Sequence, residues 1–173
     1  MTSQKPIRKM DVAGSRAIAG GVAIRSATND DTRSITALIS AVLAEFGLPF
    51  DLKSKDADLK DIEGNYFDHG GIFEVLEDGA GRILGTCGLY RLDDETVELR
   101  KMYFVPEIRG LGIGWLILSR AVDRARDMGY RTMVLETTTR LEQAIRLYQR
   151  FGFVRIATTH LSERVDQTYR LDL

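Results

Sequence analysis

The most informative stretch lies in the middle of the chain, where glycines alternate with other residues after an apolar segment. Residues 105–114 read Val-Pro-Glu-Ile-Arg-Gly-Leu-Gly-Ile-Gly. Glycine lets the backbone turn tightly and approach a ligand closely, while free N–H groups and the dipole of a following helix attract phosphate oxygens. A strand-to-helix turn alone needs only one glycine, so we interpret this stretch as an anion-binding loop.

The spacing of the glycines narrows the class of phosphate ligand. A P-loop would carry Gly-Lys-Ser/Thr to reach a triphosphate and Mg²⁺, and a dinucleotide-binding loop would read Gly-x-Gly-x-x-Gly. The third glycine of the latter pattern would fall at position 115, which is Trp115. Neither of these two classes of site fits.

Two motifs of this chain resemble those of the GNAT superfamily of N-acetyltransferases. Residues 109–114, Arg-Gly-Leu-Gly-Ile-Gly, are similar to a variant of the pyrophosphate-binding motif of that family. Residues 144–153, Ala-Ile-Arg-Leu-Tyr-Gln-Arg-Phe-Gly-Phe, are similar to its Ala-x-x-Leu-Tyr-x-x-x-Gly-Phe. The chain departs from the family at Leu141, where many members carry an asparagine that contacts the cofactor. The resemblance covers residues 22–173.

The resemblance implies a mixed α/β fold, the GNAT acyl-CoA N-acyltransferase fold, in which helices flank a central, twisted, mixed β-sheet. It also implies that acetyl-CoA, as the acetyl donor, lies in a V-shaped opening between two strands, here residues 96–105 and 132–136. Met102 and Phe104 would offer backbone groups to the pantetheine and the thioester. The cofactor-binding residues implied in this way are Met102, Tyr103, Phe104, Arg109, Gly110, Leu111, Gly112, Ile113 and Gly114.

Acetyl transfer from a thioester to an amine requires a deprotonated amine, donors for the developing oxyanion and an acid for the departing thiolate. Tyr148 is the candidate acid, because a phenol donates a hydrogen bond to sulfur and this tyrosine lies inside the second motif. The alternative is a core tyrosine on the apolar stripe of its helix.

Glu98 is the leading candidate for the base, acting directly or through a water. It lies two alternations before Met102 on one strand, which predicts that both side chains share a face, and many relatives carry a catalytic glutamate at this position. The alternative is an ion-paired glutamate beside Arg100. Glu136, at the end of the next strand, is the reserve candidate and a possible substrate contact.

The acceptor amine is less well defined. Tyr66 and His69 lie in the region where substrate specificity usually resides in this family, and a nearby acidic cluster could attract a cationic amine. Cys87 has apolar neighbours and is expected to be buried. Direct attack in a ternary complex is therefore preferred over an acetyl-cysteine. Polyamines, aminoglycosides, amino acids and protein amines all stay open; the acidic cluster is Asp51, Asp56, Asp58, Asp61 and Glu63.

The elements that must position these residues follow from periodicity and turn signals. Apolar residues at helical spacing predict a helix that begins after Thr28 and ends at Gly47. Asp78-Gly79-Ala80-Gly81 predicts a hairpin turn, and Thr139 with Glu142 predicts a capping box. The expected strands are 22–25, 71–77, 82–92, 96–105, 132–136, 153–158 and 167–171, with further helices over 114–128 and up to Gly152.

Composition bounds the remaining possibilities. The chain has 173 residues, 44% hydrophobic, and its 24 Lys and Arg against 25 Asp and Glu argue against a nucleic-acid binder. One cysteine and two histidines cannot build a disulfide framework or a zinc site, so we expect no metal and a reducing, cytoplasmic compartment. No apolar run is long enough for a membrane helix.

We expect residues 1–21 to be a flexible basic tail, with a transit peptide as the alternative, and residues 22–173 to form a single domain. A homodimer stays open. The rival function is a non-catalytic acyl-CoA-binding module, against which the presence of both Glu98 and Tyr148 argues.

Overall fold

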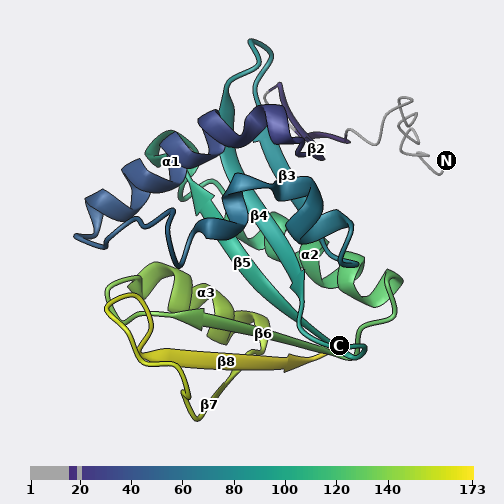
Figure 1. Cartoon of the computed structure of the whole chain (residues 1–173), viewed down its shortest axis with the longest axis vertical. Helices are drawn as coiled ribbons and strands as arrows, with labels where there is room; N and C mark the ends of the chain where they lie inside the picture. Colours follow the sequence, from purple (N-terminus) through teal and green to yellow (C-terminus); the bar gives the residue numbers. More distant parts are fainter. Residues whose placement is uncertain (1–15, 19–20) are drawn as a thin grey trace, which may run out of the picture.

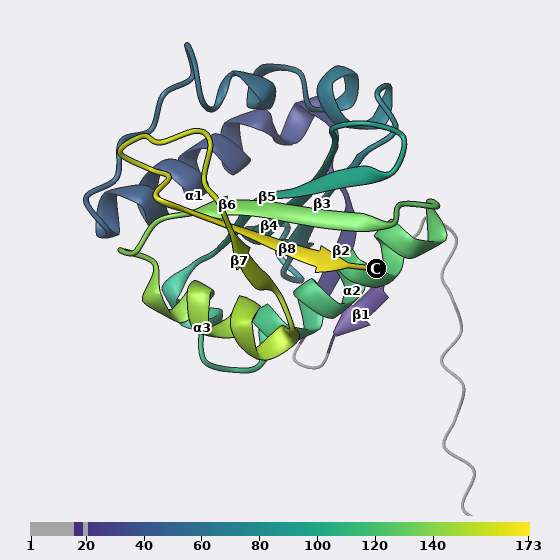
Figure 2. The same ribbon diagram turned by 90° about the horizontal axis from the view of Figure 1, so that it is seen from below.

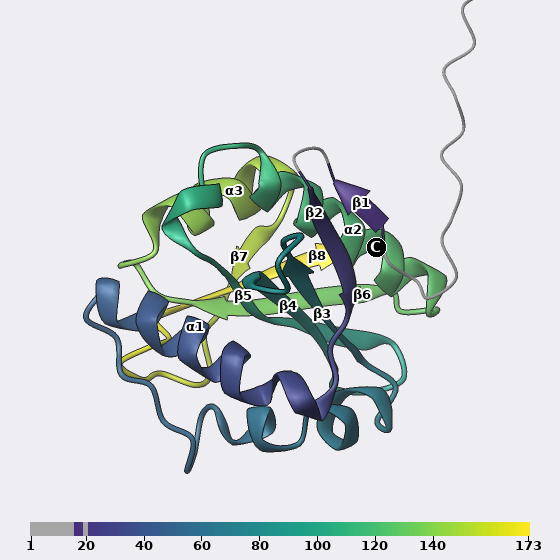
Figure 3. The same cartoon turned by 90° about the horizontal axis from the view of Figure 1, so that it is seen from above.

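The computed structural model describes residues 16–18 and 21–173, and within them a mixed eight-stranded sheet carries helices on both faces. The strand order is β1-β2-β3-β4-β5-β6-β8-β7, and only β5 and β6 pair in parallel. Figures 2 and 3 show α1 on one face of the sheet and α2 with α3 on the other. The strands are β1 (Arg16–Ile18), β2 (Val22–Ser26), β3 (Ile72–Glu77), β4 (Ile83–Arg91), β5 (Thr96–Phe104), β6 (Thr132–Thr137), β7 (Val154–Ile156) and β8 (Gln167–Asp172). The helices are α1 (Thr32–Glu45), α2 (Ile113–Asp127) and α3 (Glu142–Phe151), with short helical turns η1 (Asn29–Asp31), η2 (Ala57–Lys60), η3 (Glu63–Phe67) and η4 (Pro106–Ile108). The expected mixed α/β fold is confirmed.

Each face of the sheet has its own apolar cluster. Residues of α1 such as Ile35 and Ile39 pack with Phe73 of β3 on one face. Residues of α2 such as Leu118 pack with Met133 of β6 on the other. This division follows from the apolar stripe of each helix, which must be buried against the sheet.

An ion pair also fastens α2 to the sheet. Arg120 of α2 donates two hydrogen bonds to the Glu74 carboxylate of β3, at 2.8 and 2.7 Å. Both side chains are largely buried, and the bidentate geometry fixes the orientation of the helix.

Local signals account for most of the elements. The Asp78 carboxylate accepts hydrogen bonds from the backbone of Ala80 and Arg82, which closes the expected hairpin turn between β3 and β4. The Thr28 N–H donates to Asp31 at 2.9 Å, and the capping box there precedes α1.

Two expectations differ from the structure. Residues 16–18, inside the range expected to be a flexible tail, form β1, which pairs with β2; residues 1–15, 19 and 20 lie outside the described residues. The prediction of a capping box formed by Thr139 and Glu142 is wrong, because α3 begins at Glu142 with Leu141 at its N-cap. Thr139 instead donates its N–H and its hydroxyl to Asp166, at 2.9 and 2.8 Å, in the loop that precedes β8.

The sheet splits between its two parallel strands. β5 and β6 are paired only from Thr96 with Thr132 to Glu98 with Val134. Beyond these residues β5 stays paired with β4 and β6 with β8, so the two strands diverge, as Figure 1 shows. The expected V-shaped opening is therefore present between these strands.

A β-bulge lies on the diverging part of β5. Between the pairs of Thr86 and Gly88, a single residue of β4 faces two residues of β5, Lys101 and Met102. Lys101 has a φ of 54°, and the Thr86 hydroxyl donates to its carbonyl at 2.6 Å. A bulge increases the local twist of a strand and changes the direction of the side chains that follow.

Candidate active site

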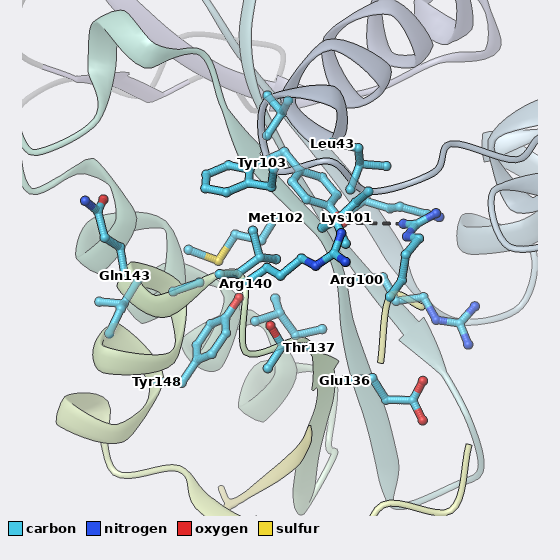
Figure 4. A pocket seen from close by; sticks show the side chains of 18 of the residues that line it. Leu43, Arg100, Lys101, Met102, Tyr103, Glu136, Thr137, Arg140, Gln143 and Tyr148 are labelled. Carbon is cyan, nitrogen blue, oxygen red and sulfur yellow. Dashed lines mark hydrogen bonds between the residues drawn. The ribbon is translucent and has the colours of Figure 1, made fainter. Parts of the chain in front are cut away.

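A cavity of about 1480 Å³ occupies the split in the sheet. Its walls come from the last residues of β5 and β6, the end of α1, the start of α3 and the loop between β7 and β8. Pockets for one small ligand typically measure roughly 300–1,000 Å³, so this cavity has room for two reactants side by side. Figure 4 shows part of its lining.

The loop between β5 and α2 presents unpaired backbone donors to this cavity. The hydrogen bonds found within the described residues include none from the backbone N–H groups of residues 110–115. Gly110 and Gly112 have φ values of 74° and 79°, a region that side chains disfavour, and a Cβ on either would meet nothing within 4 Å. Open space therefore faces the loop, and α2 begins directly after it, as an anion-binding site requires.

The other residues of the loop have structural contacts. The Arg109 guanidinium donates to the Phe104 carbonyl at 2.8 Å and to both carboxylate oxygens of Glu45, at 2.7 and 3.1 Å. It thereby ties the loop to β5 and to the end of α1. A Cβ on Gly114 would lie 3.2 Å from the Leu147 side chain, so this glycine permits close packing of α2 on α3.

Seven of the nine implied cofactor residues line the cavity. Met102, Tyr103 and Phe104 do so from β5, together with Arg109, Gly110, Gly112 and Gly114 of the loop. The Leu111 side chain is 70% exposed outside the cavity lining, and Ile113 packs against the apolar cluster under α2. These two residues can offer only their backbone groups.

Tyr148 of α3 lines the cavity, and only 7% of the residue is exposed. In Figure 4 its hydroxyl points into the cavity. Burial raises the pKa of this phenol well above its ordinary value, so it stays protonated at neutral pH and can donate a hydrogen bond. The ring also packs against Phe153, at 5.8 Å between centroids, so Tyr148 both belongs to the core and faces the cavity.

Glu98 also lines the cavity, but not on the face that the sequence predicts. The bulge at Lys101 interrupts the alternation, so Glu98 and Met102 lie on opposite faces of β5. Met102 packs with the apolar cluster under α2, whereas Glu98 pairs across the strands with Tyr90, which packs against the cluster under α1. The expectation of a shared face is wrong, because one extra residue reverses every later side chain.

The Glu98 carboxylate is held by Arg100, whose Nε donates to it at 2.7 Å. Burial raises the pKa of Glu98, although Arg100 acts in the opposite direction. The Arg100 guanidinium carbon itself lies over the Tyr90 ring, 3.8 Å from the centroid. A buried carboxylate with a raised pKa is suited to accept a proton, and the ion pair also explains the residue structurally.

The three residues considered for substrate binding are placed differently. Glu136 of β6 lines the cavity, and its carboxylate lies 3.3 Å from the His160 ring. Tyr66 is completely buried, and its hydroxyl is bonded to Asp58. His69 is exposed with its ring against the Gly64 carbonyl. Neither Tyr66 nor His69 is among the residues that line the cavity.

A buried ionic cluster beside the cavity was missed by the sequence reasoning. Asp56 is fully buried and accepts hydrogen bonds from Lys101 and Arg164, both at 2.6 Å. Burial by itself would raise the pKa of Asp56, yet Arg164 and Lys101 together hold it below its ordinary value. Asp58 lies 3.2 Å from the same lysine. These two aspartates of the acidic cluster are therefore neutralised inside the protein and do not attract a cationic amine.

Comparisons with known proteins agree with this geometry. The sequence model of the acetyltransferase (GNAT) family matches residues 36–153, and the chain therefore belongs to that family. The chain is 36% identical over 138 residues to YjgM, an uncharacterised N-acetyltransferase of Escherichia coli K12, covering 77% of this chain and 82% of that one. It is an N-acetyltransferase of the GNAT fold.

Solved structures show the same architecture. A GNAT-family acetyltransferase from Staphylococcus aureus superposes with a TM-score of 0.79 at 26% identity, over 87% of this chain and 98% of that one. An acetyltransferase from Salmonella typhimurium, solved with its cofactor acetyl-CoA, superposes with a TM-score of 0.68 at 24% identity, over 88% and 94%. Among the described residues, no helix combines the length and apolar character that a membrane crossing requires.

Proposed function

We propose that this enzyme transfers the acetyl group of acetyl-CoA to a primary amine by direct attack within a ternary complex. The proposal rests on the cavity between the diverging strands β5 and β6. The loop that holds the N–H groups of residues 110–115, for which no hydrogen bond is found within the described residues, lies at one end of the cavity, and ionisable side chains of β5 and β6 line another part of it. The pyrophosphate of CoA is the anion whose chemistry suits that loop.

In this proposal, Glu98, Tyr148 and backbone groups of β5 have different roles in acetyl transfer. Glu98, directly or through a water, accepts the proton that the acceptor ammonium must lose before it can attack. The amine nitrogen then bonds to the thioester carbon, whose oxygen takes up the negative charge, and backbone groups near Met102 and Phe104 orient the thioester. As the C–S bond breaks, the sulfur takes its proton from the Tyr148 hydroxyl. The nitrogen then gives up its remaining extra proton, which returns to the Tyr148 oxygen directly or through water and leaves the neutral amide and the free CoA thiol.

A covalent acetyl-cysteine is disfavoured. Cys87 is buried in the cluster under α2, is not among the cavity-lining residues, and burial raises the pKa of its thiol well above the ordinary value. A thiol in this state carries almost no thiolate at neutral pH, so it is a poor nucleophile.

The proposal is tested by incubating the full chain with acetyl-CoA and a library of amines, with detection of the free CoA thiol. We expect thiol release that depends on the amine and matches the amount of acetylated amine found by mass spectrometry. A chain that binds acetyl-CoA but releases no thiol with any amine would instead be a non-catalytic acyl-CoA-binding module. Tyr148→Phe serves as the control for release that does not depend on the site.

A further inference from the structure

The charged side chains that line the cavity are not balanced. Three carboxylates line it, and two of them are paired with arginines: Glu98 with Arg100, and Glu142 with Arg146. The third, Glu136, has the His160 ring as its only partner among the described residues. Within the described residues, three lining cations have no carboxylate at ion-pair distance: Lys55, Arg140 and Arg150.

The three cations belong to two different parts of the cavity. Arg150, near the end of α3, lies 5.9 Å from the centroid of the Trp115 ring, beside the loop that faces the CoA phosphates in our proposal. Arg140 and Lys55 lie instead toward the end of α1 and the loop between β7 and β8. Arg140 donates to the Gly47 carbonyl at 2.8 Å, and Lys55 is bonded to Ser162.

Arg140 is held in position for a ligand. Its hydrogen bond to Gly47 joins residues 93 positions apart and carries the side chain from the β6–α3 loop to the end of α1. In Figure 4 it extends into the cavity between Tyr103 and Tyr148. One guanidinium nitrogen, Nη1, donates to the Gly47 carbonyl, and the side chain has no carboxylate partner within the described chain. An arginine fixed in this way is suited to bind a carboxylate.

A purely cationic acceptor does not fit these charges. A polyamine that presents one amine for reaction keeps further ammonium groups, which would face Arg140 and Lys55 with only Glu136 to stabilise them. An acceptor that carries an amine and a carboxylate matches both signs. Nearby cations also lower the pKa of the reacting ammonium, which increases the fraction of amine that can attack.

We propose that the acceptor is a small amino acid, whose carboxylate is bound by Arg140 and Lys55 while its amine faces Glu136 and Glu98. This inference rests on the proposed acetyl transfer and adds the chemical class of the acceptor. Protein amines and polyamines are the alternatives that the experiment must separate.

The experiment compares three matched acceptors with acetyl-CoA and the full chain: the best amino acid of the standard twenty, its carboxamide and its decarboxylated amine, with spermidine beside them. We expect kcat/KM for the amino acid to exceed that for the carboxamide and the amine by at least about tenfold, the effect of one lost charged contact. Equal or better use of the carboxamide, the amine or spermidine would overturn the amino-acid proposal and leave acetyl transfer intact. Release of thiol with none of these acceptors, but with a protein amine or another amine of the library, would also overturn the amino-acid proposal and leave acetyl transfer intact. No release with any amine would overturn both.

Variants test whether Arg140 binds the carboxylate of the acceptor. Arg140→Gln should raise KM for the amino acid about tenfold, with little change in KM for acetyl-CoA, and should abolish the preference over the carboxamide; Arg140→Lys should restore part of it. Arg146→Gln is the matched control, because Arg146 lies on α3, is 73% exposed and pairs only with Glu142. A rise in KM for acetyl-CoA alone would assign Arg140 to the cofactor and contradict the proposal.

Discussion

On the α2 side of the cavity, the groups available to a ligand are mainly backbone N–H groups of one continuous segment, residues 110–115, with the Arg150 side chain beside them. On the α1 side they are side chains from four separate segments, among them Lys55, Glu98, Glu136 and Arg140. The first set is determined by glycines that follow one another in the chain. The second exists only once segments up to about a hundred residues apart have folded together, as the bond between Lys55 and Ser162 shows.

This difference has a functional consequence. A site built from backbone groups keeps its chemistry whenever the loop conformation is kept, so it suits the donor that all members of such a family share. A site built from side chains changes with each substitution, so it suits an acceptor that differs between members. If the two sides differ in this way, substitutions on each side should change different properties of the enzyme.

The largest effect concerns Tyr148, whose hydroxyl we propose as the acid for the departing thiolate. Tyr148→Phe removes one hydroxyl and keeps the ring packing against Phe153, so kcat should fall by about 10²- to 10⁴-fold with little change in affinity for acetyl-CoA. Steady-state kinetics and calorimetric titration with acetyl-CoA measure the two quantities. Unchanged turnover would leave Tyr148 as a packing residue of α3.

The next effect concerns the buried ionic cluster that supports the α1 side. Asp56→Asn should lower the free energy of unfolding by about 3 kcal/mol or more, because Lys101 and Arg164 would lose their shared carboxylate in the interior. Urea denaturation measures this change, and Asp172→Asn, at a 79% exposed side chain, is the control that should change nothing measurable.

The contribution of this ionic cluster to the free energy of unfolding depends on pH. The pKa of Asp56 is lower in the folded protein, so its contribution is fully present above the ordinary value of 3.8 and is lost as the pH falls below it. The difference in free energy of unfolding between the wild type and Asp56→Asn should therefore shrink below about pH 4. If wild type and Asp56→Asn differ little in free energy of unfolding at pH 7, the ionic cluster does not stabilise the α1 side of the cavity.

The third effect concerns the backbone-built side alone. Gly112→Asp places a negative side chain in the open space before α2, so affinity for acetyl-CoA should fall more than about tenfold. Gly81→Asp is the matched control: Gly81 has a φ of 80° and open space around it, but lies in the turn between β3 and β4. If both folded variants bind acetyl-CoA as the wild type does, the loop is not the anion site.

The smallest effect concerns Glu98 and varies with pH. Because burial raises the pKa of this carboxyl, kcat/KM should decline on the acidic side at a pH above the ordinary glutamate value of 4.5. Glu98→Gln should depress turnover most near neutral pH and recover partly in alkali, where free amine is abundant.

Glu142→Gln provides the comparison for that pH profile, because Glu142 also lines the cavity but is paired with the exposed Arg146. A uniform decrease across the whole profile of Glu98→Gln, or no decrease, would make Glu98 a structural partner of Arg100. The role of base would then pass to Glu136 or to bulk water.

The sequence predicted the features that local chemistry controls. The glycines of the loop and the apolar periods of α1 and α2 depend on neighbouring residues, so the fold and the loop were both predictable. The shared face of Glu98 and Met102 was predicted wrongly, because nothing in residues 96–104 marks the extra residue at Lys101. Lys101 reads as an ordinary strand lysine, and only the fold shows that its partner is Asp56, 45 positions earlier.

The same limit applies to Thr139 and Arg140. Thr139 had a capping pattern with Glu142, but its N–H and hydroxyl donate instead to Asp166 in a distant loop. Arg140 belongs to no motif. It is of interest because it has no carboxylate partner within the part of the chain that the structure describes, which is a property of the folded chain.

The division of the cavity into two differently built sides is tested most directly by measuring KM for both substrates in two variants, Gly112→Ala and Arg140→Gln. Gly112→Ala adds a methyl group where the backbone disfavours one, in the loop to which we assign the CoA pyrophosphate. We expect a crossed result: Gly112→Ala raises KM for acetyl-CoA and leaves KM for the acceptor nearly unchanged, and Arg140→Gln does the reverse. If both variants raise KM for the same substrate, the cavity is not divided in this way.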